Sequence, residues 1–232
     1  MSTQTVTPLL ATRRTGALLL ALLAPLGPLL MTLYLFVSPA STSDDVATGA
    51  ANIAASADVV QWGLLFLMLA SLFGSAGSLV VAAGIRRGAP RFGAIAAAIA
   101  FVGWIVAGYP GVYPAVAAAP AAGLSEQQTL ALIATIDGQA QSVVFNALFA
   151  CLWSSALLLG IAALIAARAR RYPMWVAILL TACMPLVVVT SLLPGKALAL
   201  GWIAVTAAYA AAGAAYVSGF GRTTSETPSD PA

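Results

Sequence analysis

The sequence contains very little charge and no histidine. Among its 232 residues, 7% are Asp, Glu, Lys or Arg, whereas about 25% is usual in soluble domains. So few charged side chains cannot cover a soluble surface of this size, which excludes an ordinary soluble domain. The absence of histidine excludes haem held by two histidines and most zinc or di-iron sites, and it removes the commonest general base.

Cysteine and lysine are also scarce. Cys151 and Cys183 both lie inside apolar runs, where a thiol packs as a small hydrophobic group, so we predict neither a disulfide nor a redox pair. The single lysine, Lys196, stands in a turn between two apolar runs, which excludes a retinal Schiff base inside a bundle. The chain also lacks a glycine-rich phosphate loop and a Gly-x-Ser-x-Gly motif. No cofactor and no metal site are therefore predicted.

Apolar residues, in contrast, make up 61% of the chain. They form runs of about 20 residues, the length that a helix needs to cross the hydrocarbon core of a bilayer. These runs predict an all-α, polytopic membrane helix bundle with six transmembrane helices. The expected spans are 16–37, 59–85, 92–109, 142–167, 174–193 and 197–217. They lie between a cytoplasmic tail at 1–15 and a disordered cytoplasmic tail at 218–232.

Two segments between the spans are predicted to form short amphipathic helices outside the membrane. In segment 41–57, Thr42 to Asp45 fits a capping box, and apolar residues follow at helical spacing. Ser125 to Gln128 fits a second capping box ahead of the fourth span. Each of these outer helices leads into a long span.

Three prolines lie near the middle of predicted spans. Pro25 and Pro28 fall in the first span and Pro185 in the fifth. A proline lacks the N–H group and frees a carbonyl one turn back, so a kink is expected at these positions. The freed carbonyls either face an ion or substrate or are covered by neighbouring helices.

The charged residues separate into two groups when they are placed on the six spans. The segments on one side hold nine arginines, whereas the other side holds five acids and Lys196 as its only cation. The positive-inside rule then places both termini in the cytoplasm. Arginine in place of lysine, together with the abundant alanine, is typical of a GC-rich bacterial genome, so a bacterial inner membrane is the expected location. The arginines are candidates for contact with anionic lipid headgroups but are too few in each cluster to indicate nucleic-acid binding. They are Arg13, Arg14, Arg86, Arg87, Arg91, Arg168, Arg170, Arg171 and Arg222.

Polar side chains on the second and fourth spans give the candidate site. They are Gln61, Ser71, Ser75 and Ser78 on the second span and Gln139, Gln141, Ser142 and Asn146 on the fourth. Such faces turn away from lipid, because an unpaired amide in hydrocarbon costs several kcal/mol. We therefore expect the two faces to meet, either as a packed seam or as a polar cavity with Asn146 as its deepest polar group.

Two acids stand at the outer ends of these same spans. Asp58 precedes the second span and Asp137 precedes the fourth. A carboxylate at a helix N-terminus is stabilised by the helix dipole and by free N–H groups. The alternative is a paired acidic vestibule for a cation or a basic solute.

The second and fourth spans also match each other at a shift of about 80 residues. Gln61 then corresponds to Gln141, and Ser75 with Ala76 corresponds to Ser155 with Ala156. Both copies would face the same way, as in a parallel repeat. Chance similarity between alanine-rich helices is the other explanation.

The layout resembles a family of small bacterial six-helix membrane proteins known only as a domain of unknown function. The resemblance rests on the Gly-x-Leu-x-x-Leu-like first helix, on segment 51–58 (Ala-Asn-Ile-Ala-Ala-Ser-Ala-Asp) and on an outer helix before the fourth span. The acid-and-aromatic pair typical of that family after this segment is reduced here to Asp58-Val59-Val60. The resemblance implies the architecture and no catalytic residues.

Three functions are compatible with the sequence. We expect a non-enzymatic protein with an accessory, assembly or partner-binding role, which includes assembly with a second copy or with another membrane protein. The alternative is a permease for a small solute or ion, with a polar cavity between the second and fourth spans. A lipid-modifying enzyme is disfavoured, because the predicted spans carry no histidine and no acid near their middle.

Overall fold

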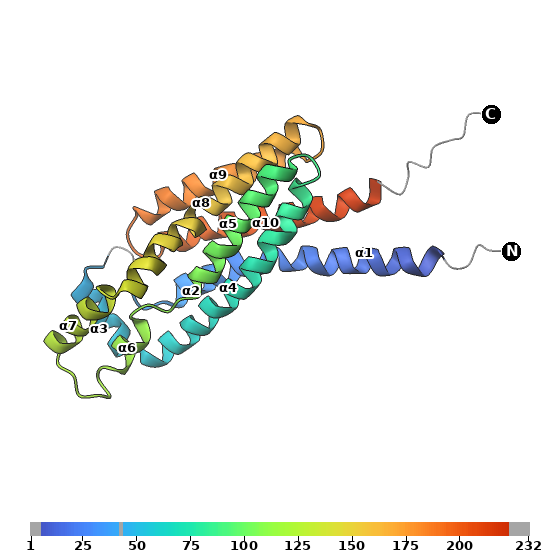
Figure 1. Cartoon of the computed structure of the whole chain (residues 1–232). Coiled ribbons are helices and arrows are strands. Elements are labelled where there is room, and N and C mark those ends of the chain that lie inside the picture. Colours follow the sequence, from blue (N-terminus) through green and yellow to red (C-terminus); the bar gives the residue numbers. More distant parts are fainter. Residues whose placement is uncertain (1–5, 42–43, 223–232) are drawn as a thin grey trace, which may run out of the picture.

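The computed structural model describes residues 6–41 and 44–222, with side chains over 15–41 and 44–219. The described residues form ten helices and no strand (Figure 1). The helices are α1 (Val6–Leu23), α2 (Leu26–Val37), α3 (Val46–Ala55), α4 (Ala57–Ile85), α5 (Pro90–Ala107), α6 (Tyr113–Ala118), α7 (Glu126–Asp137), α8 (Ala140–Arg168), α9 (Met174–Ser191) and α10 (Ala197–Arg222).

Six helical segments are long and apolar enough to cross a membrane. The first, Thr15–Val37, combines parts of α1 and α2, and the others belong to α4, α5, α8, α9 and α10. Large apolar side chains cover their outward faces; Trp62, Met68 and Ile178, for example, are 55–64% exposed. This composition suits contact with lipid acyl chains, and the predicted all-α membrane bundle is confirmed.

The spans follow one another around the bundle in chain order. In Figure 1, α4 lies beside α2 and α5, and α8 lies between α5 and α9. The last span, α10, packs on α9 and also returns to α1, α2 and α4, so it closes the bundle. Two ends result. The α4–α5 and α8–α9 loops lie at the arginine end, and α3, α6 and α7 lie at the acidic end.

The prolines of the first span break it, as predicted. The break separates α1 from α2 at Ala24 and Pro25, where Pro25 and Pro28 lack the N–H groups that would bond the carbonyls of Ala21 and Ala24 in a continuous helix. The Ala21 carbonyl accepts instead from the Ala24 N–H at 3.3 Å. A methyl group added to Gly77 on α4 would lie 2.6 Å from the Ala24 oxygen. A methyl group added to Gly213 on α10 would lie 2.6 Å from the Ala21 oxygen. Both carbonyls are therefore covered by the glycine backbones of two neighbouring helices.

The single proline of the fifth span has a different outcome. Pro185 lies inside α9, which continues from Met174 to Ser191. One missing hydrogen bond is tolerated here, whereas two prolines three residues apart interrupt successive turns of the first span.

The helices differ from the prediction in three places. Helix α1 begins at Val6, so the predicted polar tail at 1–15 is helical over most of its length. Helix α10 continues to Arg222, so the predicted disordered tail is helical over 218–222, and residues 223–232 lie outside the described part of the chain. The six-residue helix α6 was not predicted, because the prolines around it indicated only a helix stop.

Three short helices form a cap at the acidic end, which we call the outer cap. Helices α3 and α6 pack on each other and on α4, and α7 packs on α3 and α8. Their small core contains Ala50, Ile53, Val60, Val116 and Ile133, with Leu130 and Tyr113 at its edge. It is separate from the main core of the spans. The two predicted outer helices are thus present as α3 and α7, joined by the unpredicted α6.

Side-chain caps start both predicted outer helices. Ser125 and Gln128 form the predicted reciprocal capping box at the start of α7. Helix α3 starts instead at Asp45, whose carboxylate accepts hydrogen bonds from the backbone N–H and the hydroxyl of Thr48, both at 2.8 Å. The Thr42 and Ser43 part of the predicted first box lies outside the described residues.

The Asp45 side chain that starts α3 makes the stability of the outer cap sensitive to acid. The hydrogen bonds from the backbone N–H and hydroxyl of Thr48 hold the pKa of Asp45 below its ordinary value of 3.8. The stabilisation is therefore complete above that value and is lost as the pH falls through the lower value of the folded state. We expect the Thr48 amide to lose protection from hydrogen exchange, corrected for the intrinsic rate, as the pH falls below the ordinary value of 3.8 and then through the lower pKa of the folded state. Asp45→Asn keeps the capping oxygen and should abolish this pH dependence; an unchanged profile would contradict the assignment.

The structure also shows a repeated order of helices. Helices α3, α4 and α5 contain 10, 29 and 18 residues, and α7, α8 and α9 contain 12, 29 and 18. Helices α4 and α8 begin at Ala57 and Ala140, 83 positions apart. This separation differs by almost one helical turn from the predicted shift of about 80 residues. The equal lengths and order are compatible with a parallel repeat.

Candidate functional site

The serine face of α4 is buried against two helices. Ser71 donates to the Ile105 carbonyl of α5 at 3.4 Å, and Ser75 donates to the Ser71 carbonyl of its own helix at 2.8 Å. The Ser78 and Tyr209 hydroxyls lie 3.2 Å apart, joining α4 to α10. The serine hydroxyls therefore bind α4, α5 and α10, and none bonds α8.

The polar face of α8 does not meet those serines. Ser142 is buried, and its hydroxyl lies 3.4 Å from that of Tyr109, whose ring stacks on Phe145 at 4.3 Å. Gln141 donates to Gln139 at 2.9 Å on the exposed first turn of α8. The residues Gln61 and Asn146 are also exposed.

Helix α5 separates the two faces. Gly103 of α5 lies so close to α8 that an added methyl group would be 2.4 Å from the Leu152 backbone nitrogen. The serines of α4 and the polar residues of α8 therefore do not meet in the predicted seam, although the two helices are in contact. Asn146 is not its deepest polar group either, because it follows Phe145 at the level of Tyr109, beyond the end of α5 at Ala107. The sequence does not indicate that α5 lies between these two polar faces, because the spacing of polar residues does not say which helices become neighbours.

The two vestibule acids occupy different ends of helices. Asp58 lies in the first turn of α4, where the helix dipole stabilises a carboxylate, as predicted. Asp137, however, is the last residue of α7, and Gln139 is the residue that precedes α8. Asp137 therefore stands at the negative end of a helix dipole, which corrects the expected N-terminal role. Both carboxylates are exposed to solvent.

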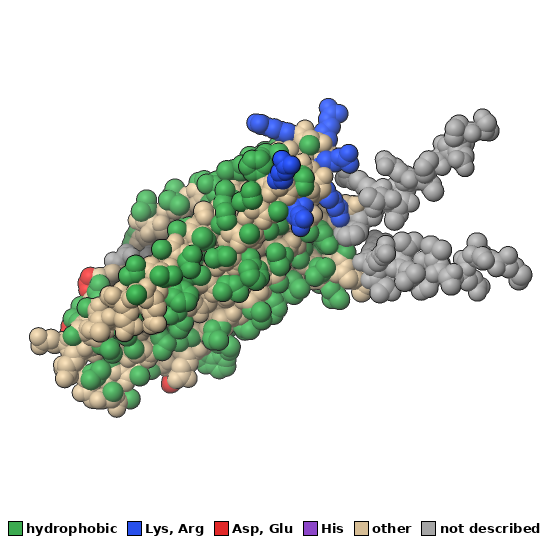
Figure 2. All heavy atoms as spheres, viewed as in Figure 1, with side chains coloured by type: hydrophobic (Ala, Val, Ile, Leu, Met, Phe, Trp, Pro, Cys, Tyr) green, Lys and Arg blue, Asp and Glu red, His purple; other side chains and the backbone are tan. Residues whose placement is uncertain are grey.

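The acidic end as a whole is negative. It carries five carboxylates and one ammonium group, a net charge of −4. Figure 2 shows acidic side chains at separate points of this end rather than in one cluster. The described residues include no group of three His, Cys, Asp or Glu that could hold a metal ion. The end therefore offers a distributed negative surface.

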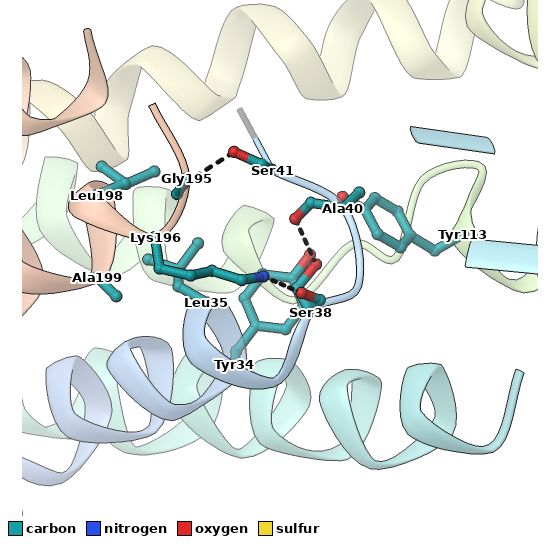
Figure 3. Close-up of a pocket in the computed structure, with 10 residues that line it drawn as sticks. All are labelled: Tyr34, Leu35, Ser38, Ala40, Ser41, Tyr113, Gly195, Lys196, Leu198 and Ala199. Atoms are coloured by element: carbon teal, nitrogen blue, oxygen red, sulfur yellow. Dashed lines mark hydrogen bonds between the residues drawn. The ribbon is translucent and has the colours of Figure 1, made fainter. Parts of the chain in front are cut away.

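A small hollow at the acidic end was not predicted. It has a volume of about 90 Å³ and lies where the end of α2, the α9–α10 turn and α6 meet (Figure 3). The rings of Tyr34 and Tyr113 line it, together with Leu198 and Ala199.

Lys196 joins two segments across the hollow. Its ammonium group donates to the Ser38 carbonyl, and the Ser41 hydroxyl donates to the Gly195 carbonyl at 2.8 Å. Figure 3 shows both bonds side by side. The only lysine thus ties the α9–α10 turn to the segment after α2, which leaves the surrounding acids without a neighbouring free cation in the described part of this end.

The arginine end has the opposite character. Figure 2 shows its basic side chains gathered at one end of the molecule. They come from the α4–α5 loop (Arg86 and Arg87), the first turn of α5 (Arg91), the end of α8 (Arg168) and the α8–α9 loop (Arg170 and Arg171). The sorting of charge between the two ends agrees with the prediction made from the spans.

No protein-family model matches the chain, and neither curated proteins nor solved structures match it. The fold and the sorting of its apolar surface define a multi-pass membrane protein with six spans.

Proposed function

We propose that this protein is a non-enzymatic accessory protein of a bacterial inner membrane whose outer cap docks a basic segment of a partner protein. The proposed orientation places the arginine end and both termini in the cytoplasm, according to the positive-inside rule. The resemblance to small bacterial six-helix proteins supports this location. Residues outside the spans then carry the recognition.

One observation carries the proposal, namely the exposed acids of the outer cap. Glu126 and Asp137 lie at opposite ends of α7, and Asp58 lies in the first turn of α4 at the same end of the molecule. All three are exposed, and among the described residues none of their carboxylates caps a helix or a turn, unlike those of Asp44 and Asp45. Negative charge spread over a small folded surface attracts a basic segment by electrostatic complementarity.

Photo-cross-linking in cells tests the docking. A photoreactive amino acid at the exposed position Gln127 samples the cap surface. In the triple variant Asp58→Asn, Glu126→Gln and Asp137→Asn, the net charge of the acidic end falls from −4 to −1. We expect the yield of the cross-linked partner to fall about tenfold, because three exposed charge pairs contribute about 0.5 kcal/mol each.

The matched control keeps every charge. Asp58→Glu, Glu126→Asp and Asp137→Glu change the same positions and should retain the cross-link. A cross-linked partner captured equally by the neutral and the charged variants would refute recognition by the acids. Loss of cation flux in the neutral variant, with the cross-link unchanged, would instead favour the permease.

A further inference from the structure

Two loops at the arginine end lie in direct contact. Gly88 of the α4–α5 loop faces the start of the α8–α9 loop so closely that an added methyl group would lie 2.8 Å from the Arg171 Cβ atom and 2.9 Å from Ala166. The arginines of both loops therefore belong to one surface, although they are about 80 residues apart in the chain. Figure 2 shows this surface as a single basic region.

One arginine of this region, Arg87, makes contacts within the protein. The Arg87 guanidinium carbon lies 5.7 Å from the centre of the Tyr216 ring, and its Nη1 atom lies against Gly219. Arg87 therefore turns towards the last turns of α10, where a cation is favourable. The arginines that remain exposed for a ligand are Arg86, Arg91, Arg168, Arg170 and Arg171.

Two helices start at the same surface. Helix α5 begins after Ala89 and α9 begins after Pro173, and neither start has a side-chain cap. Their first N–H groups point towards the arginine end, and the positive ends of both dipoles add to the arginine charges. A group with several anionic oxygens complements this arrangement of charges and donors.

Arg170 follows the end of α8 at a backbone position where glycine is usual. Helix α8 ends with the Arg171 N–H bonded to Ala166 and the Arg170 N–H bonded to Ala167, at 3.0 and 2.9 Å. Arg170 takes the left-handed position of this motif with a φ of 56°, and it is the only described non-glycine residue with a positive φ. Glycine adopts a positive φ without strain, whereas the side chain of arginine makes the same conformation unfavourable. The strain is compatible with a role for the side chain.

Exposed apolar residues adjoin the basic surface on its membrane side. Phe92 follows Arg91 directly and is 59% exposed, and Trp175 on the first turn of α9 is 62% exposed. Aromatic rings at this depth lie between headgroups and acyl chains. A ligand with an anionic head and apolar chains would contact both parts.

We propose that the α4–α5 and α8–α9 loops together bind the phosphate of an anionic phospholipid in the leaflet at the arginine end. Planar donors to the phosphate oxygens come from Arg86, Arg91, Arg168, Arg170 and Arg171, and the uncapped starts of α5 and α9 provide backbone N–H groups. Phe92 and Trp175 contact the upper acyl chains. The proposal is independent of docking at the outer cap, which lies at the opposite end.

Native mass spectrometry of the full chain in detergent tests the site. The protein is titrated with dioleoyl phosphatidylglycerol or with dioleoyl phosphatidylcholine, whose ammonium group is repelled by the arginines. We expect one phosphatidylglycerol to bind with higher affinity than phosphatidylcholine. The variant Arg86→Lys, Arg91→Lys, Arg168→Lys and Arg171→Lys should bind phosphatidylglycerol about tenfold more weakly, because lysine cannot make bidentate bonds to phosphate.

Charge-conserving controls separate a site from general attraction. Arg13→Lys and Arg14→Lys make the same chemical change outside the two loops and should leave binding unaltered. Arg170→Gly should raise thermal stability by relieving the left-handed arginine, and it should still weaken phosphatidylglycerol binding. Equal binding of the two lipids, or equal weakening in the tail and loop variants, would overturn the proposal. Displacement of phosphatidylglycerol by millimolar inorganic phosphate would overturn the assignment to a lipid.

Discussion

Gly103→Val is expected to destabilise the bundle by about 3 kcal/mol, because overpacking a tight contact forces the backbones apart. At this position α5 meets α8 without any intervening side chain, and even a methyl group would lie 2.4 to 2.5 Å from the Leu152 backbone. Backbone atoms cannot rotate away as a flexible side chain can. The two helices would have to separate, and the contacts that they share along their length would be lost.

The measurement is the midpoint of thermal unfolding in detergent, followed by circular dichroism. Gly16→Val is the matched control, because it makes the same change in an apolar helix where nothing lies within 4 Å of an added methyl group. The control should unfold close to the wild type. Equal midpoints for the two variants would show that α5 and α8 do not approach as closely as described.

Trp104→Ala is expected to cost about 4 kcal/mol of stability, in the range found for removal of large aromatic residues from cores. Trp104 is 1% exposed in the centre of the spans, its ring covers the backbone of Gly74, and it lies 5.7 Å from the Trp202 ring. Membrane bundles depend on such packing, because lipid supplies little hydrophobic driving force between helices. The indole N–H has no hydrogen-bond partner among the described residues, so the loss comes from the ring contacts.

The control for this prediction is another tryptophan of the same chain. Trp62 is 63% exposed on the outward face of α4, and Trp62→Ala should change the unfolding midpoint far less. Trp104→Phe should fall between the two, since it retains part of the ring volume. If Trp62→Ala were the more damaging change, then the exposed face of α4 and not the Trp104 cluster would carry the packing.

The positions of the candidate residues in the structure show how much the spacing of polar residues in a sequence can predict. The periodicity of Ser71, Ser75 and Ser78 correctly predicted a buried face on α4, because an apolar helix in lipid turns its hydroxyls inward. The pattern could not identify the partner of that face. Tyr209, which bonds Ser78, is 131 positions away in a span whose alanines gave no polar signal.

Asn146 shows the limit of the same argument. An amide within an apolar run was interpreted as a buried group, yet the residue is exposed. Helix α8 has 29 residues and a length of about 43 Å at 1.5 Å per residue, so it is longer than the hydrocarbon core of about 30 Å. Its first turns extend beyond the level where α5 ends. The sequence does not say which end of a long helix projects from the membrane.

By itself, the sequence determined the class of the protein, the six spans, the starts of two outer helices and the separation of arginines from acids. Each of these depends on residues that are near neighbours in the chain, such as an apolar run, a Ser125 cap or an Arg86-Arg87 pair. The tertiary structure decided how those elements meet. Gly103 allows α5 to pack closely on α8, and Gly88 allows the two arginine loops to lie in contact on one surface. Helix α6 completes the core of the outer cap. These contacts depend on close approach between distant segments, and a glycine in an apolar run does not reveal which helix will lie against it.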